Sequence, residues 1–236
     1  MGTTAQVLLV IAALLLPPAT SAAVKADEHR AFWLWSGVKP TSALKDAQTV
    51  YLHQAEILLR PSGVVFQKVG LPVSHLTFPH IWLTVRIETL DVPDAYFQRL
   101  NTLLDNWQKA GNQVVGLQID FDAATRRLGD YGMFLKRVRA LMPPQYALGV
   151  TGLLDWAKTG NIAVLNTLPV DELVIQCYQG RNTVPNYAEY LPALTGLRIP
   201  FKLGLVQDGE WDPAQVPRFS EAYRGTVIFM LNPIRR

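Results

Sequence analysis

Two aspartates, Asp120 and Asp122, stand two residues apart at the end of an apolar run, and Gln118 precedes them at the same interval. If residues 114–122 form a strand, these three side chains share one face, because successive side chains point to opposite sides. A strand buried on both faces holds polar side chains only at high cost unless they are paired or functional. Neighbouring carboxylates also push their pKa values apart, so one can hold a proton while the other is charged. The pattern therefore predicts an acid–base site.

The two aspartates also have a structural interpretation. Asp122 could cap the following loop, and Asp120 could pair with Arg126, Arg127 or an arginine of another strand. The shared face with Gln118 favours a functional site, because two buried carboxylates without partners would be costly.

The elements that must position this pair alternate between short apolar segments and amphipathic ones. Phe97, Leu100, Leu104 and Trp107 recur at helical spacing, and a second helix is expected over residues 128–142. Eight main strands are expected over residues 31–37, 55–59, 80–88, 114–122, 146–153, 172–178, 201–206 and 225–231, with a short extra strand over 64–69. This alternation predicts an α/β fold, a single (β/α)8 TIM-barrel-like domain over residues 30–236, compact or slightly irregular.

In such a barrel, functional side chains gather where the strands end. Arg86 and Glu88 share a face there and predict either a salt bridge to the aspartate pair or a second acid. An amide and a phenol suit hydroxyl groups, and indoles suit sugar rings, although each tryptophan could instead pack in the core. The catalytic candidates are Asp120, Asp122 and Glu88, and the substrate-binding candidates are Trp35, Arg86, Gln118, Trp156, Gln176 and Tyr178.

The N-terminal segment is typical of an exported protein. An apolar run over residues 7–16 is followed by Pro17-Pro18 and small residues, which predicts a signal peptide over residues 1–23. We expect no membrane span after its cleavage and a location in the bacterial periplasm. Because no Lys or Arg precedes Val7, an uncleaved anchor or lipid-facing helix stays open. Cys177 is the only cysteine, so no intramolecular disulfide can form, which fits the periplasm.

Composition and motifs exclude several other classes. Hydrophobic residues make up 49% of the 236 residues and charged ones 17%, as expected of a core-rich globular protein. The net charge of +3 comes without a Lys/Arg block and does not indicate a nucleic-acid partner. The sequence contains no HExxH, GxSxG or GxGxxG motif, so no cofactor or zinc site is expected; Mg²⁺ or Ca²⁺ on the aspartate pair is left open. The oligomeric state is not indicated.

Residues 115–156 resemble an uncharacterised bacterial family known as domain of unknown function 3142. In that family a strand of the form G-[LV]-[EQ]-I-D-x-D precedes an A-T pair, a Tyr-centred helix and a strand leading to a Trp. The matching residues are Gly116-Leu117-Gln118-Ile119-Asp120-Phe121-Asp122, Ala124-Thr125, Tyr131 and Trp156, and the segments 86–88 and 174–178 also look like it. The resemblance covers most of the chain after residue 30. It implies a barrel of the glycoside-hydrolase type, from a family without an established activity.

The same strand looks like the end of the chitinase-type DxxDxDxE motif. Aligning Asp120 and Asp122 with its last two aspartates places Leu117 at the first Asp and Ala124 at the Glu. That glutamate is the proton donor of chitinase-like enzymes, so their mechanism does not transfer. We therefore expect a glycoside-hydrolase-like protein acting on a polysaccharide or cell-envelope glycan. Asp122 or Glu88 would be the general acid, with Asp120 orienting it or stabilising positive charge. The alternatives are a non-catalytic carbohydrate-binding barrel and an assembly partner in an envelope complex.

Overall fold

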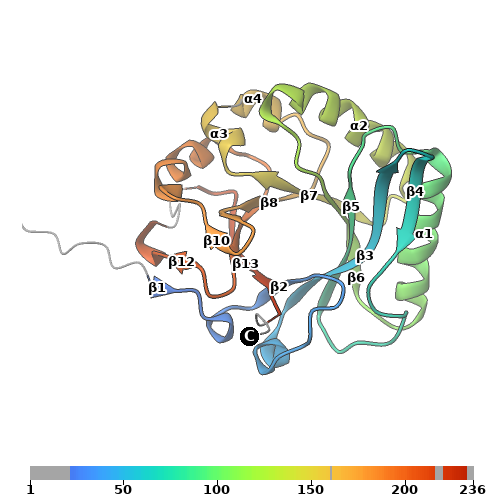
Figure 1. The fold of residues 1–236 in the computed structure, drawn as a ribbon, viewed down its shortest axis with the longest axis horizontal. Helices are drawn as coiled ribbons and strands as arrows, with labels where there is room; N and C mark the ends of the chain where they lie inside the picture. The colour runs from blue at the N-terminus through green and yellow to red at the C-terminus, as the bar shows by residue number, and fades with distance from the viewer. Residues whose placement is uncertain (1–21, 160, 216–219, 233–236) are drawn as a thin grey trace, which may run out of the picture.

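The computed structural model describes residues 22–159, 161–215 and 220–232 (Figure 1). The predicted signal peptide falls largely on residues 1–21, which lie outside the described residues; Ala22 and Ala23 form the short strand β1. Within the described part of the chain, no helix combines the length and the apolar character needed to cross a membrane.

Eight parallel strands close into a barrel, which Figure 1 shows nearly end on. Each strand pairs with the next, and the last, β13, pairs with the first, β2. The barrel strands in order are β2 (Ala31–Leu34), β3 (Thr49–Arg60), β5 (His80–Ile87), β6 (Val114–Asp120), β7 (Ala147–Leu153), β8 (Glu172–Gln176), β11 (Phe201–Val206) and β13 (Tyr223–Met230). The predicted TIM-barrel-like fold is confirmed.

Five small strands of the described chain lie outside the barrel wall. The expected extra strand, β4 (Gly63–Lys68), runs antiparallel to β3. The other pairs are β1 (Ala22–Ala23) with β12 (Glu210–Trp211), and β9 (Tyr178–Gln179) with β10 (Asn182–Thr183).

Helices cover the barrel unevenly, which makes it irregular. Long helices follow only β5 and β6, as α1 (Asp94–Lys109) and α2 (Leu128–Leu141), while α3 (Asp155–Thr159) and α4 (Ile162–Leu165) are short. Short 3-10 helices lie in several loops of the described chain, one of them directly before α2: η1 (Ala26–Glu28), η2 (Ser42–Asp46), η3 (Thr125–Arg127), η4 (Tyr187–Glu189), η5 (Leu191–Gly196) and η6 (Pro213–Gln215). In Figure 1 the four α-helices lie along the top and right of the barrel.

The barrel wall separates two apolar layers, because side chains alternate across each strand. The outer layer packs the strands against the helices and includes Leu104, Trp107 and Tyr131. The inner layer fills the barrel with Trp33, Tyr51, Trp82, Val174 and Phe229.

The start of β3 differs from the prediction. The expected strand began at residue 55, whereas β3 begins at Thr49. Residues 49–54 mix apolar and polar types, so they do not read as an apolar run. Tyr51 and His53 are nevertheless buried, and Tyr51 belongs to the inner layer.

Candidate functional site

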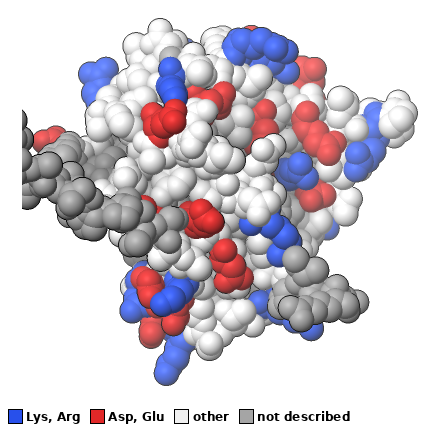
Figure 2. Space-filling model, turned by 60° about the vertical axis from the view of Figure 1, so that its left-hand side comes forward, with Lys and Arg blue, Asp and Glu red and all other residues white. Residues whose placement is uncertain are grey.

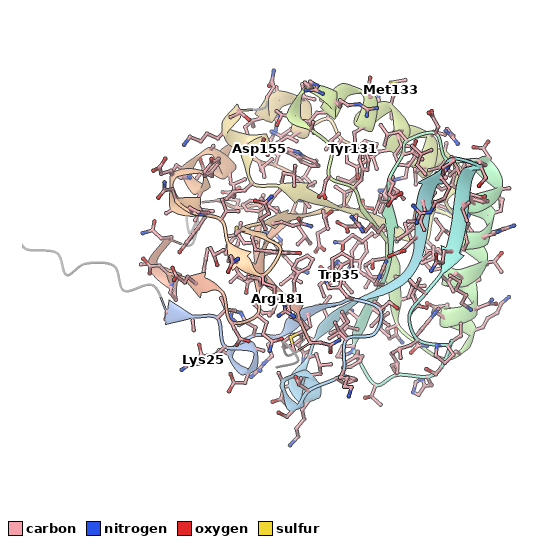
Figure 3. All side chains as sticks on the ribbon, in the orientation of Figure 1. Lys25, Trp35, Tyr131, Met133, Asp155 and Arg181 are labelled. Carbon is pink, nitrogen blue, oxygen red and sulfur yellow. The ribbon has the colours of Figure 1, made fainter. Side chains whose placement is uncertain are left out.

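A pocket of about 690 Å³ opens where the barrel strands end. Asp120, Leu153 and Gln176 are the last residues of three neighbouring strands, β6, β7 and β8. The lining residues are Trp35, Arg86, Asp120, Asp122, Leu153, Leu154, Asp155, Gln176, Tyr178, Gln179, Gly180, Val184 and Tyr190. Figure 3 shows Trp35 toward the interior of the ring of strands and Asp155 at the start of α3. Six of the nine predicted site residues therefore meet at this pocket: Trp35, Arg86, Asp120, Asp122, Gln176 and Tyr178.

Asp120 forms part of the pocket floor and is only 5% exposed. Its Oδ1 accepts hydrogen bonds from Thr151 Oγ1 at 2.6 Å and from Gln176 Nε2 at 3.3 Å. Its other oxygen, Oδ2, has no hydrogen-bond partner among the described residues. One oxygen is thus fixed by the neighbouring strands, while the other is available to a ligand.

The surroundings of Asp120 favour its protonated form. Burial raises the pKa of Asp120 to about 6. The hydrogen bond from Thr151 opposes this rise, the charge of Asp122 adds to it, and Arg86 and Gln176 oppose it more weakly. A carboxyl with such a pKa exchanges its proton near neutral pH, as acid–base catalysis requires.

Asp122 lies at the rim of the same pocket and is exposed. It was expected to lie in the strand, but β6 ends at Asp120. The chain then turns, with Ala123 N donating to Phe121 O at 2.8 Å. Within the described chain, the Asp122 side chain forms no hydrogen bond or ion pair. The two aspartates therefore share a pocket but differ in environment.

A third carboxylate, Asp155, lines the pocket from the first residue of α3. Its Oδ2 accepts a hydrogen bond from Thr125 Oγ1 at 2.9 Å. The next residue, Trp156, donates from Nε1 to Ala123 O at 2.8 Å, which joins the same two loops. Asp155 was not among the predicted site residues, although its position just after a barrel strand is a signal that could have identified it.

Tyr190 was also missed, and no sequence signal indicated it. It comes from the long connection between β8 and β11, which has short 3-10 helices and no strong periodicity. Lys158 Nζ lies 4.5 Å from the centre of its ring and forms a 3.2 Å ion pair with Glu189.

The remaining predicted residues at the pocket supply aromatic and polar surface. Trp35 is half-buried and packs against Trp33, with ring centres 4.2 Å apart. Burial raises the pKa of Tyr178 well above its usual value, so its phenol stays protonated. Arg86 is exposed and forms no ion pair with any described carboxylate, so the predicted salt bridge to the aspartate pair is not formed.

Glu88 does not reach the pocket, contrary to its expected place as a second acid. Its Oε2 accepts a hydrogen bond from Leu59 N at 2.9 Å and lies 3.5 Å from Arg60 Nη1. The reason is that β5 ends at Ile87, so strand alternation no longer directs the next side chain.

Gln118 and Trp156 are buried away from the pocket, so their predicted contact with substrate is corrected. Gln118 lies two residues before Asp120 on the inner face, where its Oε1 accepts from Trp33 Nε1 at 2.7 Å. The Trp156 ring packs in the outer layer over Gly152, where an added Cβ would lie 2.8 Å from it. Both are core residues, and neither lines the pocket.

Charged groups elsewhere do not suggest another kind of site. Among the described residues, no group of three or more His, Cys, Asp and Glu could hold a metal ion. On the face shown in Figure 2, acidic and basic side chains are interspersed and form no extended patch of one sign.

The fold and the site together define a parallel α/β barrel with an acidic, aromatic-lined pocket at the ends of its strands. The family described as "Domain of unknown function (DUF3142)" matches residues 79–190, which confirms the predicted resemblance over this segment. The segment contains every pocket residue except Trp35.

Among solved structures, the chain is similar to the Bacillus cereus spore cortex-lytic enzyme SleL. The identity is 15% and the TM-score 0.48, over 81% of this chain and 52% of that one. The chain therefore spans about half the length of that structure. No curated protein matches the chain.

Proposed function

We propose that the protein binds a glycan in the pocket and hydrolyses a glycosidic bond, with Asp120 as the general acid. The observation that carries this proposal is the buried Asp120 carboxyl, held by Thr151 and Gln176 through one oxygen only. Its pKa of about 6 suits a group that must hold a proton and release it near neutral pH.

The other pocket walls suit a sugar. Trp35, Tyr178 and Tyr190 offer aromatic surface, which packs against the apolar faces of sugar rings. Gln176 and Gln179 offer amides that can pair with hydroxyl groups. The volume of about 690 Å³ lies in the range of small-ligand sites, which fits a few sugar units of a longer chain.

The roles proposed here for the aspartates reverse those expected from the sequence. Asp122 was expected to be the acid, but it is exposed and has no hydrogen-bond partner among the described residues. Asp120, in contrast, is buried, and burial raises its pKa to about 6. Asp122 is then a charged group near the reacting sugar, where it stabilises developing positive charge.

We further propose a cell-envelope glycan as the substrate and the bacterial periplasm as the location. The support is the apolar N-terminal run at residues 7–16, outside the described residues, and the single cysteine.

A second candidate function, glycan binding without cleavage, is favoured by one observation. Ala124, at the position where the chitinase-type motif has its proton-donating Glu, is exposed in the loop after β6 and supplies no carboxyl. If Asp120 does not replace that acid, the same pocket would hold a sugar without turnover.

The test is incubation of the wild type, Asp120→Asn and Asp122→Asn with peptidoglycan fragments, chitooligosaccharides and other bacterial polysaccharides. Cleavage and retention are measured in parallel by chromatography and calorimetry. We expect Asp120→Asn to lose about 100-fold or more in turnover while it still binds the glycan. The matched control is Asp130→Asn, an exposed carboxylate on α2.

Three outcomes would change the proposal. Full turnover in Asp120→Asn removes Asp120 as the acid. Binding by the wild type without turnover favours the second candidate. If no glycan is bound or cleaved, both functions are wrong.

A further inference from the structure

We infer that Asp155 is the second catalytic carboxylate, acting as the general base that activates the attacking water. The inference rests on the proposed hydrolysis. It adds a residue that neither the family motif nor the position of the Asp120/Asp122 pair indicates.

The first support is the place of Asp155 in the pocket. Asp120 is the last residue of β6, and Asp155 begins α3 just after the adjacent strand β7 ends. The inner face of β7 already touches Asp120, because Thr151 donates to it at 2.6 Å. Asp155 follows four residues later and lines the same pocket.

The second support is how the Asp155 carboxylate is held. Thr125 donates to Oδ2 at 2.9 Å, while Oδ1 has no hydrogen bond to any residue that the structure describes. The donated hydrogen bond fixes the direction of the carboxylate, as a base that must reach one water requires. The arrangement resembles that of Asp120: both residues line the pocket, and in each one oxygen accepts a hydrogen bond while the other accepts none from the described residues.

The third support is that Thr125 holds Asp155 near Ala124, the position at which the chitinase-type motif has its proton-donating Glu. Thr125 directly follows Ala124 in the chain. The hydrogen bond from Thr125 therefore holds the Asp155 carboxylate, from the start of α3, next to a loop position that has no carboxyl of its own. The bond from Trp156 to Ala123 locks the two loops together at the same place.

Asp122 is a weaker choice for this role. It is exposed and lacks any hydrogen bond to the described residues, so nothing fixes the direction of its oxygens. A base must lie within hydrogen-bond reach of the water it activates. Asp155 is the pocket carboxylate, besides Asp120, that another side chain orients.

Hydrolysis then proceeds as a single displacement at the anomeric carbon. Asp155 takes a proton from a solvent water, and the water oxygen forms a bond to the anomeric carbon. The bond from that carbon to the leaving oxygen breaks, and its electron pair stays on the leaving oxygen, which receives the proton of Asp120. Solvent then returns a proton to Asp120 and removes one from Asp155. Because water attacks from the face opposite the leaving group, the product has the inverted configuration.

The experiment compares the wild type with Asp155→Asn and Thr125→Val on a glycan that the wild type cleaves. We expect Asp155→Asn to lose about 100-fold or more in kcat with little change in glycan affinity. Thr125→Val keeps the carboxylate but removes the donor that orients it, so kcat should fall while KM and glycan affinity change little. Asp130→Asn is the control, and NMR of the first product should show inversion. Circular dichroism verifies that each variant is folded.

The possible failures are distinguishable. If Asp155→Asn keeps full turnover while Asp120→Asn loses it, the role of Asp155 is wrong and the proposed function stands. An unchanged kcat in Thr125→Val, or a product of retained configuration, also overturns the assignment. If the wild type cleaves nothing, the proposed hydrolysis itself fails, and the role of Asp155 with it.

Discussion

Replacing Asp120 with Asn should make the protein more stable at neutral and basic pH. Asn keeps an oxygen that can accept the hydrogen bonds from Thr151 and Gln176. It removes the negative charge, which burial disfavours in the folded state. The variant therefore separates the charge of Asp120 from its packing.

The size of the effect follows from the change in pKa on folding. The pKa of Asp120 rises from 3.8 to about 6, so the folded protein binds this proton more tightly than the unfolded chain does. The resulting stability is complete below pH 3.8 and is lost as the pH rises through 6. At about 1.4 kcal/mol for each tenfold change in proton affinity, the loss reaches about 3 kcal/mol at pH 8 and about 1.5 kcal/mol at pH 5.

Urea unfolding of the wild type and Asp120→Asn at pH 5 and pH 8 tests this reasoning. We expect the variant to be more stable by up to about 3 kcal/mol at pH 8, with a gap about half as large at pH 5. The exposed Asp130→Asn should show no such pH-dependent gap. If Asp120→Asn is equal to or less stable than the wild type at pH 8, or if the gap does not shrink at pH 5, the buried-charge account of Asp120 is wrong.

Three further predictions concern the barrel around the site. Gly152→Ala should lower the free energy of unfolding by about 1–3 kcal/mol, because its Cβ would lie 2.8 Å from the Trp156 ring; an unchanged urea midpoint would contradict this. Lys202→Met should lower it by about 3 kcal/mol, because it leaves the buried Glu172 without its cation at 2.9 Å. Lys202→Met should still bind any glycan that the wild type binds. An unchanged free energy of unfolding would show that the ion pair does not stabilise the fold. Burial raises the pKa of Cys177 to about 12, so its thiol should react with a disulfide reagent at pH 8 only after unfolding; rapid labelling of the native protein would refute its burial.

The sequence predicted the parts of the site that depend on local periodicity. Strand alternation follows from backbone geometry, so Asp120 and Gln118 were expected on one face, and both point into the barrel. The parallel arrangement of the strands likewise predicted that Arg86 and Gln176 meet Asp120 at one end of the barrel.

The prediction failed where the strands stop. Glu88 was placed by continuing the alternation of β5, but the strand ends one residue earlier and the side chain turns toward Arg60. Trp156 was expected at the mouth because it follows a strand, yet its ring fills the space that Gly152 leaves in the outer layer. The direction of a side chain after a strand end depends on tertiary packing, which has no period in the sequence.

Two buried acids of the described barrel interior, Asp120 and Glu172, differ in how their oxygens are paired. At the opposite side of the interior, Glu172 receives Lys202 Nζ at 2.9 Å and the Tyr51 hydroxyl, so both of its oxygens are paired. Asp120 has no cation partner among the described residues, and one of its oxygens is unpaired. A carboxyl that serves packing alone is satisfied, as Glu172 is, because an unpaired buried charge destabilises the fold. Asp120 carries a penalty of about 3 kcal/mol at pH 8, which an apolar side chain or an amide would avoid. Such a destabilising group is expected where a ligand completes its hydrogen bonding, and this contrast supports the proposal that Asp120, rather than Glu172, is the acid of the site.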